Sequence, residues 1–401
     1  MRRILILLFF TGSFGVFSQG INFEHDTSLA QLKAKAKKLN KPIFIDCYTT
    51  WCGPCKWMVK NVFPNDTVGR YFNENFICAK IDMEKGDGKN IGTRYKVRFY
   101  PTSLFLDSTG KELHRDIGAK PVQEFVKMAQ TANDANRRLS TLKEKYKSGN
   151  RDLQFIQDYI FAANAAGDAD VQDVFYWYMA MLPKDKLVTT ANFELIQVFC
   201  RSMDNPVYTD FTKNKDAFTN LVGKKKTDQV TSTAMYWSMM KCYKDDPANP
   251  DGPWLLDDEK KFLSLMKEMR TTGIDTIELV SEFMPHYYLA KGNKNAYFNT
   301  LRKCLPLCCW NDASKLNEKA WEMYEKSTDK NDLLLALDWS KRSIELDDNY
   351  YYNDTYAALC YKLKNKKDAL KHQQKAIELG EKSGEDVKDA KERLELIKKM
   401  K

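Results

Sequence analysis

The sequence predicts an α/β domain followed by an all-α domain that is built partly from helical repeats. Short apolar runs typical of buried strands alternate with helical patterns up to Ala119. After Ala119 the strand-like alternation disappears, whereas helical spacing persists. Near the C-terminus a pattern recurs along the chain. At 401 residues the chain also exceeds the usual size of one hydrophobic core, so more than one domain is expected.

The start of the chain has the build of a secretory signal peptide. Arg2 and Arg3 supply a positive start, residues 4–10 form an apolar run, and residues 16–18 form a short exit toward a cleavage site. The apolar run is too short to span a bilayer comfortably, which disfavours the alternative of an uncleaved membrane anchor. We therefore expect residues 1–18 to be a signal peptide and the protein to be exported to the periplasm.

The charge of the chain disfavours a nucleic-acid partner. The formal net charge of +9 arises from 63 basic and 54 acidic residues that are scattered along the sequence. A nucleic-acid-binding face requires a larger basic cluster with interleaved aromatic groups. After the predicted signal peptide no stretch approaches about twenty uninterrupted apolar residues. We therefore expect neither nucleic-acid binding nor stable insertion into a membrane.

Two thiols, Cys52 and Cys55, stand two residues apart in the stretch IDCYTTWCGPCKWM. A zinc site is disfavoured because the chain has four histidines, none of them close in sequence, and no second Cys-x-x-Cys. A structural staple is disfavoured because so short a loop gains little chain entropy. Redox exchange is the favoured interpretation of the pair in an oxidising compartment.

The surroundings of the two thiols predict a strand, a loop and a helix. Residues 43–48 have the pattern of a buried strand, and Pro54 lies where the first turn of a helix accepts proline. Cys52 is therefore expected at a helix N-terminus, where unpaired backbone N–H groups and the macrodipole favour the thiolate. We predict that Cys52 is the reachable, attacking sulfur and Cys55 the resolving sulfur. Gly53 lets a substrate backbone come close to the sulfur.

The following segment completes the predicted sheet. Pro101 opens the third predicted strand, one of the few places where a sheet tolerates proline. The sharper interpretation is a cis Tyr100–Pro101 bond that faces the dithiol. The predicted elements are a strand at 76–82, a short helix at 89–96, a strand at 99–107 and a fourth strand before 117.

The stretches DCYTTWCGPCK, AKIDME and RFYPTSLFLDSTGK resemble the thioredoxin superfamily. The stretch NVFPNDTVGRYFNENFICAKID resembles the thioredoxin-like domains of exported thiol:disulfide interchange proteins. The resemblance implies an α/β thioredoxin fold, with a central mixed sheet of four or five strands and helices on both faces. It also implies dithiol exchange through a mixed disulfide, a cis Pro101 and substrate-binding residues Trp51, Gly53, Pro54, Tyr100 and Pro101. The sequence departs from the common pattern at Cys47, where an aromatic residue is usual.

The resemblance also places a buried acid and its lysine partner. Asp46 lies six residues before Cys52, as the buried acid of the family does, and Lys80 falls at the position of the partner lysine. A carboxylate that is desolvated behind a disulfide has a raised pKa, so it can take a proton from Cys55 near neutral pH. The alternative is an ion pair that serves stability alone.

The Gly-Pro spacer resembles the reducing members of the superfamily, which favours a reductase or isomerase. In an oxidising space such a protein needs an electron donor, and a membrane transporter of reducing equivalents is expected. No segment of the chain is expected to bind a nicotinamide or a flavin, so no cofactor is predicted.

The rest of the chain is predicted to be helical. Residues 120–147 have the pattern of one or two amphipathic helices, and a helical hairpin closed by Gly167 is expected to end before Pro183. The aromatic and methionine side chains of this hairpin could line a ligand groove, but helix-packing core is the favoured interpretation. They are Phe175, Tyr178, Met179 and Met181.

Ala336 and Leu337 recur as Ala369 and Leu370, and SIEL recurs as AIEL at the same shift. This spacing resembles tetratricopeptide repeats, whose usual work is to hold another protein. Asn353, Ala357 and Asp348 depart from the repeat pattern, so the repeats are degenerate. The predicted domains are a signal peptide at 1–18, a thioredoxin-like domain at 19–132, a helical hairpin domain at 133–310 and tetratricopeptide-like repeats at 311–401.

The other cysteines are expected to be buried small apolar groups, or to pair within the stretch CLPLCCW. In that stretch Pro306 is expected to break the helix. A bridge from Cys304 to Cys308 or Cys309, or to Cys242, stays open because pairing cannot be deduced from sequence. The expected buried thiols are Cys47, Cys78, Cys200, Cys242 and Cys360.

Two hypotheses of function follow. The favoured one is an exported thiol:disulfide oxidoreductase that exchanges disulfides with protein clients, while the helical domain recruits clients or partners. The second is an interaction protein in which the helical repeats are the working part and the dithiol is a redox-sensitive latch without turnover.

Overall fold

The computed structural model describes residues 20–25, 27–245, 247 and 254–400. The chain divides into two compact units, one that ends at Leu187 and one that begins at Val188. The predicted signal peptide lies outside the described residues. Within the described ranges, no helix is both long enough and apolar enough to cross a bilayer.

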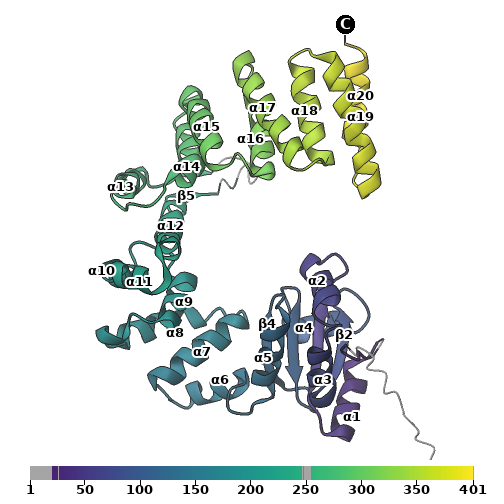
Figure 1. Cartoon of the computed structure of the whole chain (residues 1–401), viewed down its shortest axis with the longest axis vertical. Coiled ribbons are helices and arrows are strands. Elements are labelled where there is room, and N and C mark those ends of the chain that lie inside the picture. Colours follow the sequence, from purple (N-terminus) through teal and green to yellow (C-terminus); the bar gives the residue numbers. More distant parts are fainter. Residues whose placement is uncertain (1–19, 26, 246, 248–253, 401) are drawn as a thin grey trace, which may run out of the picture. The chain divides into compact units, whose positions relative to one another are not determined.

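The first unit contains a four-stranded mixed sheet with the strand order β2-β1-β3-β4 (Figure 1). β1 pairs in parallel with β2 and antiparallel with β3, and β3 pairs antiparallel with β4. β1 is an almost continuous apolar run because it is paired on both sides and covered on both faces. All four strands confirm the predicted ones: β1 (Ile43–Tyr48), β2 (Ile77–Asp82), β3 (Thr102–Leu106) and β4 (Glu112–Ile117).

Helices cover both faces of the sheet, as expected for a thioredoxin fold. Side chains alternate along β1, so that Ile45 faces one core cluster and Phe44 faces the other. The Phe44 ring lies 4.8 Å from that of Phe72 and 5.1 Å from that of Phe105. One face is covered by α1 (Leu29–Leu39) and α4 (Gly88–Arg94), the other by α2 (Gly53–Asn61), α3 (Asp66–Asn75) and α5 (Val122–Asn133).

Three further helices belong to the same compact unit. The backbone N–H of Leu139 donates to Nδ1 of the buried His114 on β4 at 3.2 Å, which ties α6 to the sheet edge. The unit with the sheet therefore extends beyond residue 132. Gly167, with φ of 69°, closes the predicted hairpin. These helices are α6 (Leu139–Lys147), α7 (Leu153–Ala165) and α8 (Val171–Met181).

The four aromatic and methionine side chains noted in the predicted hairpin lie partly in the core and partly at the surface. Phe175, Tyr178 and Met179 are buried, whereas Met181 is 53% exposed. Three of the four residues therefore pack as helix core.

Where the structure describes it, the second unit is helical except for a short two-stranded sheet. The sequence predicted no strand after Ala119, but β5 and β6 pair antiparallel. Each strand has only two residues, too few to leave an alternating pattern. The elements up to β6 are η1 (Lys184–Lys186), which ends the first unit, α9 (Thr190–Phe199), α10 (Pro206–Lys213), α11 (Lys215–Val222), α12 (Lys224–Met240), β5 (Tyr243–Lys244) and β6 (Leu255–Leu256).

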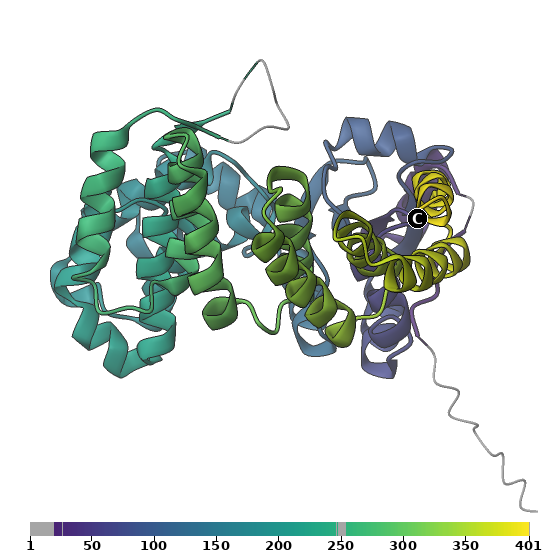
Figure 2. The same cartoon turned by 90° about the horizontal axis from the view of Figure 1, so that it is seen from above.

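Consecutive helices of the C-terminal part pack as pairs, and Figure 2 shows the last of them side by side from above. Ala336 in α17 and Ala369 in α19 are fully buried, as close helix packing requires. The assignment to tetratricopeptide repeats remains a prediction. The helices are α13 (Glu259–Met269), α14 (Ile277–Ala290), α15 (Lys294–Cys308), α16 (Ala313–Lys326), α17 (Lys330–Leu346), α18 (Tyr350–Lys362), α19 (Lys366–Ser383) and α20 (Lys388–Lys398).

The prediction that Pro306 breaks a helix is wrong. Pro306 lies inside α15, which continues to Cys308. A proline removes a single backbone donor, and here it lies within the last turn, so little of the helix remains to be disrupted.

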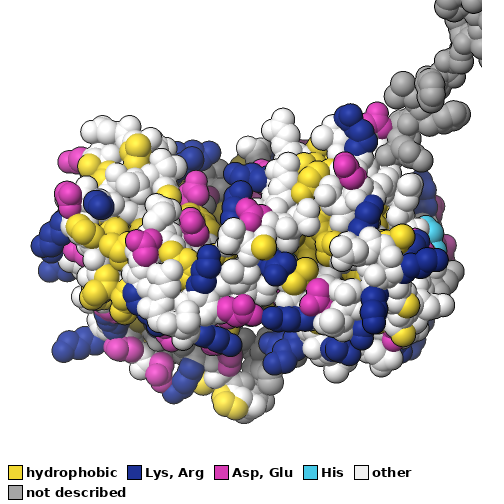
Figure 3. All heavy atoms as spheres, turned by 90° about the horizontal axis from the view of Figure 1, so that it is seen from below, with side chains coloured by type: hydrophobic (Ala, Val, Ile, Leu, Met, Phe, Trp, Pro, Cys, Tyr) yellow, Lys and Arg dark blue, Asp and Glu magenta, His cyan; other side chains and the backbone are white. Residues whose placement is uncertain are grey.

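The surface carries charges of both signs. On the face drawn in Figure 3, basic and acidic side chains are interspersed rather than gathered into one large patch. This distribution agrees with the scattered charge of the sequence.

Candidate active site

The two thiols of the motif lie at the start of α2, as predicted. Cys52 is the N-cap residue, and Gly53 and Pro54 open the first turn. Cys52 and Cys55 are joined by a disulfide, and the backbone N–H of Cys55 donates to Sγ of Cys52 at 3.1 Å. This sulfur therefore occupies the place where the helix offers an unpaired donor to a negative charge.

The expectation that Cys52 is reachable is wrong for this oxidised form. Cys52 and Cys55 are each 3% exposed. The reason is that the Cys52 sulfur packs against the first turn of α2, where it is bonded to Cys55 and accepts a hydrogen bond from the Cys55 N–H. The exposed residues of the loop are its neighbours, Trp51, Gly53 and Pro54.

Asp46 and Lys80 meet as direct register partners on the parallel strands β1 and β2. The Lys80 Nζ lies 2.9 Å from Oδ2 of Asp46, whose side chain is 3% exposed. Burial raises the pKa of Asp46, and the charge and hydrogen bond of Lys80 offset part of that rise. Lys80 also lies over the Tyr48 ring, with Nζ 3.9 Å from the centroid.

Strand alternation places Asp46 on the same face of the sheet as Phe44, the face that α2 covers. Among the described residues, no hydrogen bond joins the Asp46 carboxylate to either sulfur of the disulfide. Lys80 lines a cavity of about 610 Å³ together with Tyr48 and Asp82. Asp46, Cys52 and Cys55 are not among the residues that line this cavity.

The loop before β3 meets the disulfide loop through two aromatic rings. The Tyr100–Pro101 bond is cis, as predicted. The ring of Tyr100 contacts that of Trp51 edge to face, with centroids 5.9 Å apart. Trp51 is 65% exposed, and its Nε1–H donates to Oε1 of Glu84 at 3.0 Å. The structure thus brings Trp51 and Tyr100 together as one surface beside the disulfide.

Glu84 is a part of this surface that the sequence reasoning missed. It lies two residues beyond the end of β2. Because β1 and β2 are parallel, their carboxyl ends meet at the same sheet edge, where the loop with Trp51 begins. That topology was the signal that could have identified Glu84.

Known proteins match the N-terminal part of the chain. Residues 25–108 match a family model described as thioredoxin-like. Over 96 residues the chain is 33% identical to the chloroplastic thioredoxin Y of Oryza sativa subsp. japonica, which covers 24% of this chain and 54% of that protein. Over 90 residues it is 32% identical to thioredoxin-like protein slr0233 of Synechocystis, covering 22% of this chain and 80% of that protein.

A third relative is the thiol:disulfide interchange protein DsbD of Yersinia pestis, which is 34% identical over 112 residues. The match covers 27% of this chain and 18% of that protein. The chain thus spans about half the length of thioredoxin Y and under a fifth of DsbD. The similarity concerns one domain of this chain.

Proposed function

The chain belongs to the thioredoxin superfamily through its N-terminal domain, a thiol:disulfide oxidoreductase domain, and we propose that the whole protein is an exported reductase or isomerase of disulfide-bonded proteins. The observation that carries the proposal is the Cys52–Cys55 disulfide at the N-terminus of α2, where Sγ of Cys52 receives a backbone N–H. A thiol in this place is held closer to its ionised, nucleophilic form.

The proposed reaction starts from the reduced pair. The Cys52 thiolate attacks one sulfur of a client disulfide, which forms a mixed disulfide and releases a client thiolate. Cys55 then loses its proton and attacks Sγ of Cys52, which closes the Cys52–Cys55 bond and releases the second client thiolate. Two electrons pass to the client, and its two thiolates take up two protons.

Asp46 is proposed as the group that takes the proton of Cys55, and Lys80 as its positioning residue. The raised pKa of Asp46 supports this role, because a carboxyl that titrates closer to neutral pH exchanges protons readily there. Because no direct hydrogen bond links Asp46 to the sulfurs, the transfer is proposed to pass through water.

Clients are proposed to bind at the exposed surface beside the disulfide. The proposed binding set is Trp51, Gly53, Pro54, Tyr100 and Pro101. Trp51, Gly53 and Pro54 are exposed, Tyr100 is half-buried and Pro101 is buried, and Trp51, at 65%, is the most exposed apolar side chain of the set. Glu84 holds the indole in place through its Nε1–H. Reduction opens the Cys52–Cys55 bond, after which the Cys52 sulfur is free to turn toward this surface.

The second unit is proposed to recruit clients or another protein partner. A cavity of about 710 Å³ beside α12 and α14 supports this role, because its lining combines Tyr236 and Trp237 with charged groups. Export by the signal peptide at 1–18 and a membrane electron donor complete the proposal. The similarity to a thiol:disulfide interchange protein supports disulfide exchange as its chemistry.

The latch hypothesis is a second candidate, and the 3% exposure of Cys52 favours it. A test of turnover separates the two. With dithiothreitol as donor, the purified chain should reduce the disulfides of insulin over many cycles, and Cys52→Ser should abolish this activity. Cys200→Ser, at a buried free cysteine of the second unit, is the matched control. If the unaltered chain reduces insulin no faster than dithiothreitol alone, the latch hypothesis replaces the oxidoreductase.

A further inference from the structure

The chain contains a second disulfide, between the adjacent residues Cys308 and Cys309. Neither of the bridges considered from the sequence, to Cys304 or to Cys242, is formed, and both of those thiols are free and buried. The sequence has ten cysteines, and six of them are free and buried. The buried free thiols confirm the apolar role expected for Cys47, Cys78, Cys200, Cys242 and Cys360.

A bond between neighbouring residues is a poor structural staple. The entropy that a disulfide removes from the unfolded chain grows with the length of the loop it closes, and here that loop is the shortest one possible. The Cys52–Cys55 bond shares this property, since it closes a loop of only three residues' separation. The stabilisation expected from chain entropy is therefore small for both disulfides. A redox role is the alternative explanation for each of them.

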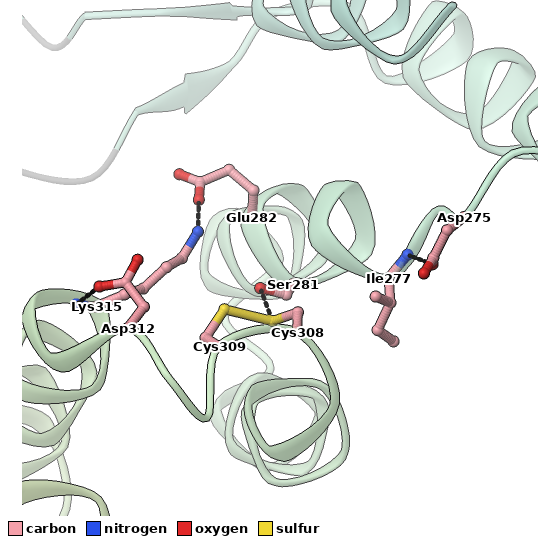
Figure 4. The surroundings of a disulfide bond; sticks show 8 residues. All are labelled: Asp275, Ile277, Ser281, Glu282, Cys308, Cys309, Asp312 and Lys315. Atoms are coloured by element: carbon pink, nitrogen blue, oxygen red, sulfur yellow. Dashed lines mark hydrogen bonds and ion pairs between the residues drawn. A yellow bond between two sulfur atoms is a disulfide. The ribbon is translucent and has the colours of Figure 1, made fainter. Parts of the chain in front are cut away.

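The two cysteines of this pair differ in exposure. Cys308 is the last residue of α15 and is partly exposed, whereas Cys309 is 4% exposed. The Cys308 Sγ lies 3.4 Å from Oγ of Ser281, whose hydroxyl supplies the hydrogen because the disulfide carries none. Figure 4 shows this contact and the Glu282–Lys315 ion pair beside it. Cys308 is the more exposed residue of the pair, so we take its sulfur as the one that a nucleophile attacks and Cys309 as the leaving sulfur.

Both disulfides lie next to an unusually exposed apolar side chain. Among the large hydrophobic residues that the structure describes, the two most exposed are Leu307, at 73%, and Trp51, at 65%. Leu307 directly precedes Cys308, as Trp51 directly precedes Cys52. Each of these side chains offers apolar contact area beside the cysteine that follows it in the sequence.

We propose that Cys308–Cys309 is a second redox-active disulfide and that the reduced Cys52/Cys55 pair is its reductant. This inference rests on the proposed function. The Cys52 thiolate attacks Sγ of Cys308, which forms a Cys52–Cys308 bond and releases Cys309, and Cys309 takes up a proton. Cys55 then attacks Sγ of Cys52 and releases Cys308, which takes up the second proton. The Cys52–Cys55 bond is formed, the Cys308–Cys309 bond is broken, and two electrons are transferred.

The opposite helix ends support this assignment of attacker and target. Cys52 caps the N-terminus of α2, where the thiolate is favoured, while Cys308 ends α15, where the helix dipole disfavours it. Since the rate of exchange follows the thiolate fraction of the attacking thiol, Cys52 attacks and Cys308 is attacked.

The test compares the unaltered chain with Cys52→Ser/Cys55→Ser, both oxidised beforehand with diamide. Each is given a low concentration of dithiothreitol, quenched with an alkylating agent at intervals, and digested, and the labelling of Cys308 and Cys309 is followed by mass spectrometry. We expect labelling in the unaltered chain to be at least about tenfold faster than in the variant. Equal rates in a chain that still reduces insulin would overturn this inference and leave the oxidoreductase intact. Absence of the bond after diamide would overturn it as well.

A trapping variant keeps the test independent of the folding of that double substitution. Cys55→Ser keeps the Cys308–Cys309 disulfide as the target and lacks the sulfur that would displace Cys308, so a Cys52–Cys308 bond should accumulate as a cross-linked peptide, within one chain or between two, with Cys309 released as a thiol. Cys55→Ser/Cys308→Ser is the matched control, in which the accessible target is removed and this cross-link is lost. Failure to recover the Cys52–Cys308 peptide from a protein that still forms mixed disulfides with insulin would contradict the exchange.

Discussion

The two disulfides of this chain lie at opposite ends of helices. Sγ of Cys52 receives a backbone N–H from the first turn of α2, whereas Cys308 closes the last turn of α15, where backbone carbonyl groups are left without helical partners. The dipole of a helix favours negative charge at its start and disfavours it at its end. This difference in placement underlies our proposal that Cys52 is the attacking thiolate and Cys308 its target.

Each region also contains a carboxylate bonded to a lysine, and the two carboxyls shift in opposite directions. Burial raises the pKa of Asp46. Burial acts on Glu282 in the same sense, but the hydrogen bond and charge of Lys315, with Lys319 and His286, outweigh it and lower the pKa of Glu282. Asp46 can therefore exchange a proton closer to neutral pH, while Glu282 stays ionised. Asp46 is thus the proposed base of the first region, whereas Glu282 is a fixed charge in the second.

The largest effect expected from this contrast is that of Asp46→Asn. Without a base for the Cys55 thiol, the rate of insulin reduction at neutral pH should fall about a hundredfold. Glu282→Gln, the matched change in the other region, should leave the rate unaltered. The measurement is the initial rate with dithiothreitol as donor. A loss of less than about twofold for Asp46→Asn would reduce the Asp46–Lys80 pair to a structural ion pair.

The second largest expected effect is a difference between the thiol pKa values of Cys52 and Cys308. In the fully reduced chain, the apparent pKa of Cys52 should lie below the free value of about 8.5, and that of Cys308 above it. Alkylation followed against pH, with each peptide resolved by mass, gives both values in one experiment. Because each pKa comes from the shape of its own curve, the different burial of the two sulfurs does not disturb the comparison. A pKa of Cys308 at or below that of Cys52 would contradict the assignment of attacker and target.

Lys80→Met should move the pH dependence of the reaction. Asp46 accepts a proton only when ionised, so the rate should fall as the pH drops through its raised pKa. The Lys80 ammonium lowers the pKa of Asp46, and its removal should therefore shift this acid limb to higher pH, by about one unit. The rate of insulin reduction between pH 5 and pH 9 checks the shift. Lys315→Met is the control, and an acid limb that stays in place in Lys80→Met would show that the pair is not coupled to the reaction.

The smallest expected effect concerns the exposed apolar side chains. Trp51→Ala should raise the KM for insulin about fivefold with kcat nearly unchanged, because it removes contact area and no reacting group. Leu307→Ala should leave this KM unaltered and slow only the reduction of Cys308–Cys309. Steady-state kinetics and peptide labelling separate the two readouts. The opposite pattern, in which Leu307→Ala alone raises the KM, would move client binding to the second unit.

The sheet and the dithiol loop could be predicted because their signals are local. The apolar run of β1, the proline in the first turn of α2 and the proline before β3 each report the conformation of their own neighbourhood. The pairing of Asp46 with Lys80 could be predicted only from the resemblance to a family, because the sequences of two parallel strands do not determine their register.

The remaining features depend on contacts that no local pattern carries. The disulfide between Cys308 and Cys309 depends on the backbone conformation at the end of α15. Pro306 predicted an earlier end of this helix, so the sequence did not indicate that conformation. The burial of Cys52 depends on the position that its sulfur takes when it is bonded to Cys55. The extension of the first unit beyond residue 132 depends on contacts such as that of Leu139 with His114.

The most direct measurement of the central claim is the identity of the sulfur that joins a client. Cys55→Ala should be reduced, freed of reductant and mixed with insulin, and the mixed disulfides should be digested and identified by mass. The account predicts that the insulin cysteines are linked to Cys52. A link through Cys308, or no link at all, would contradict the role of Cys52 as the attacking thiolate.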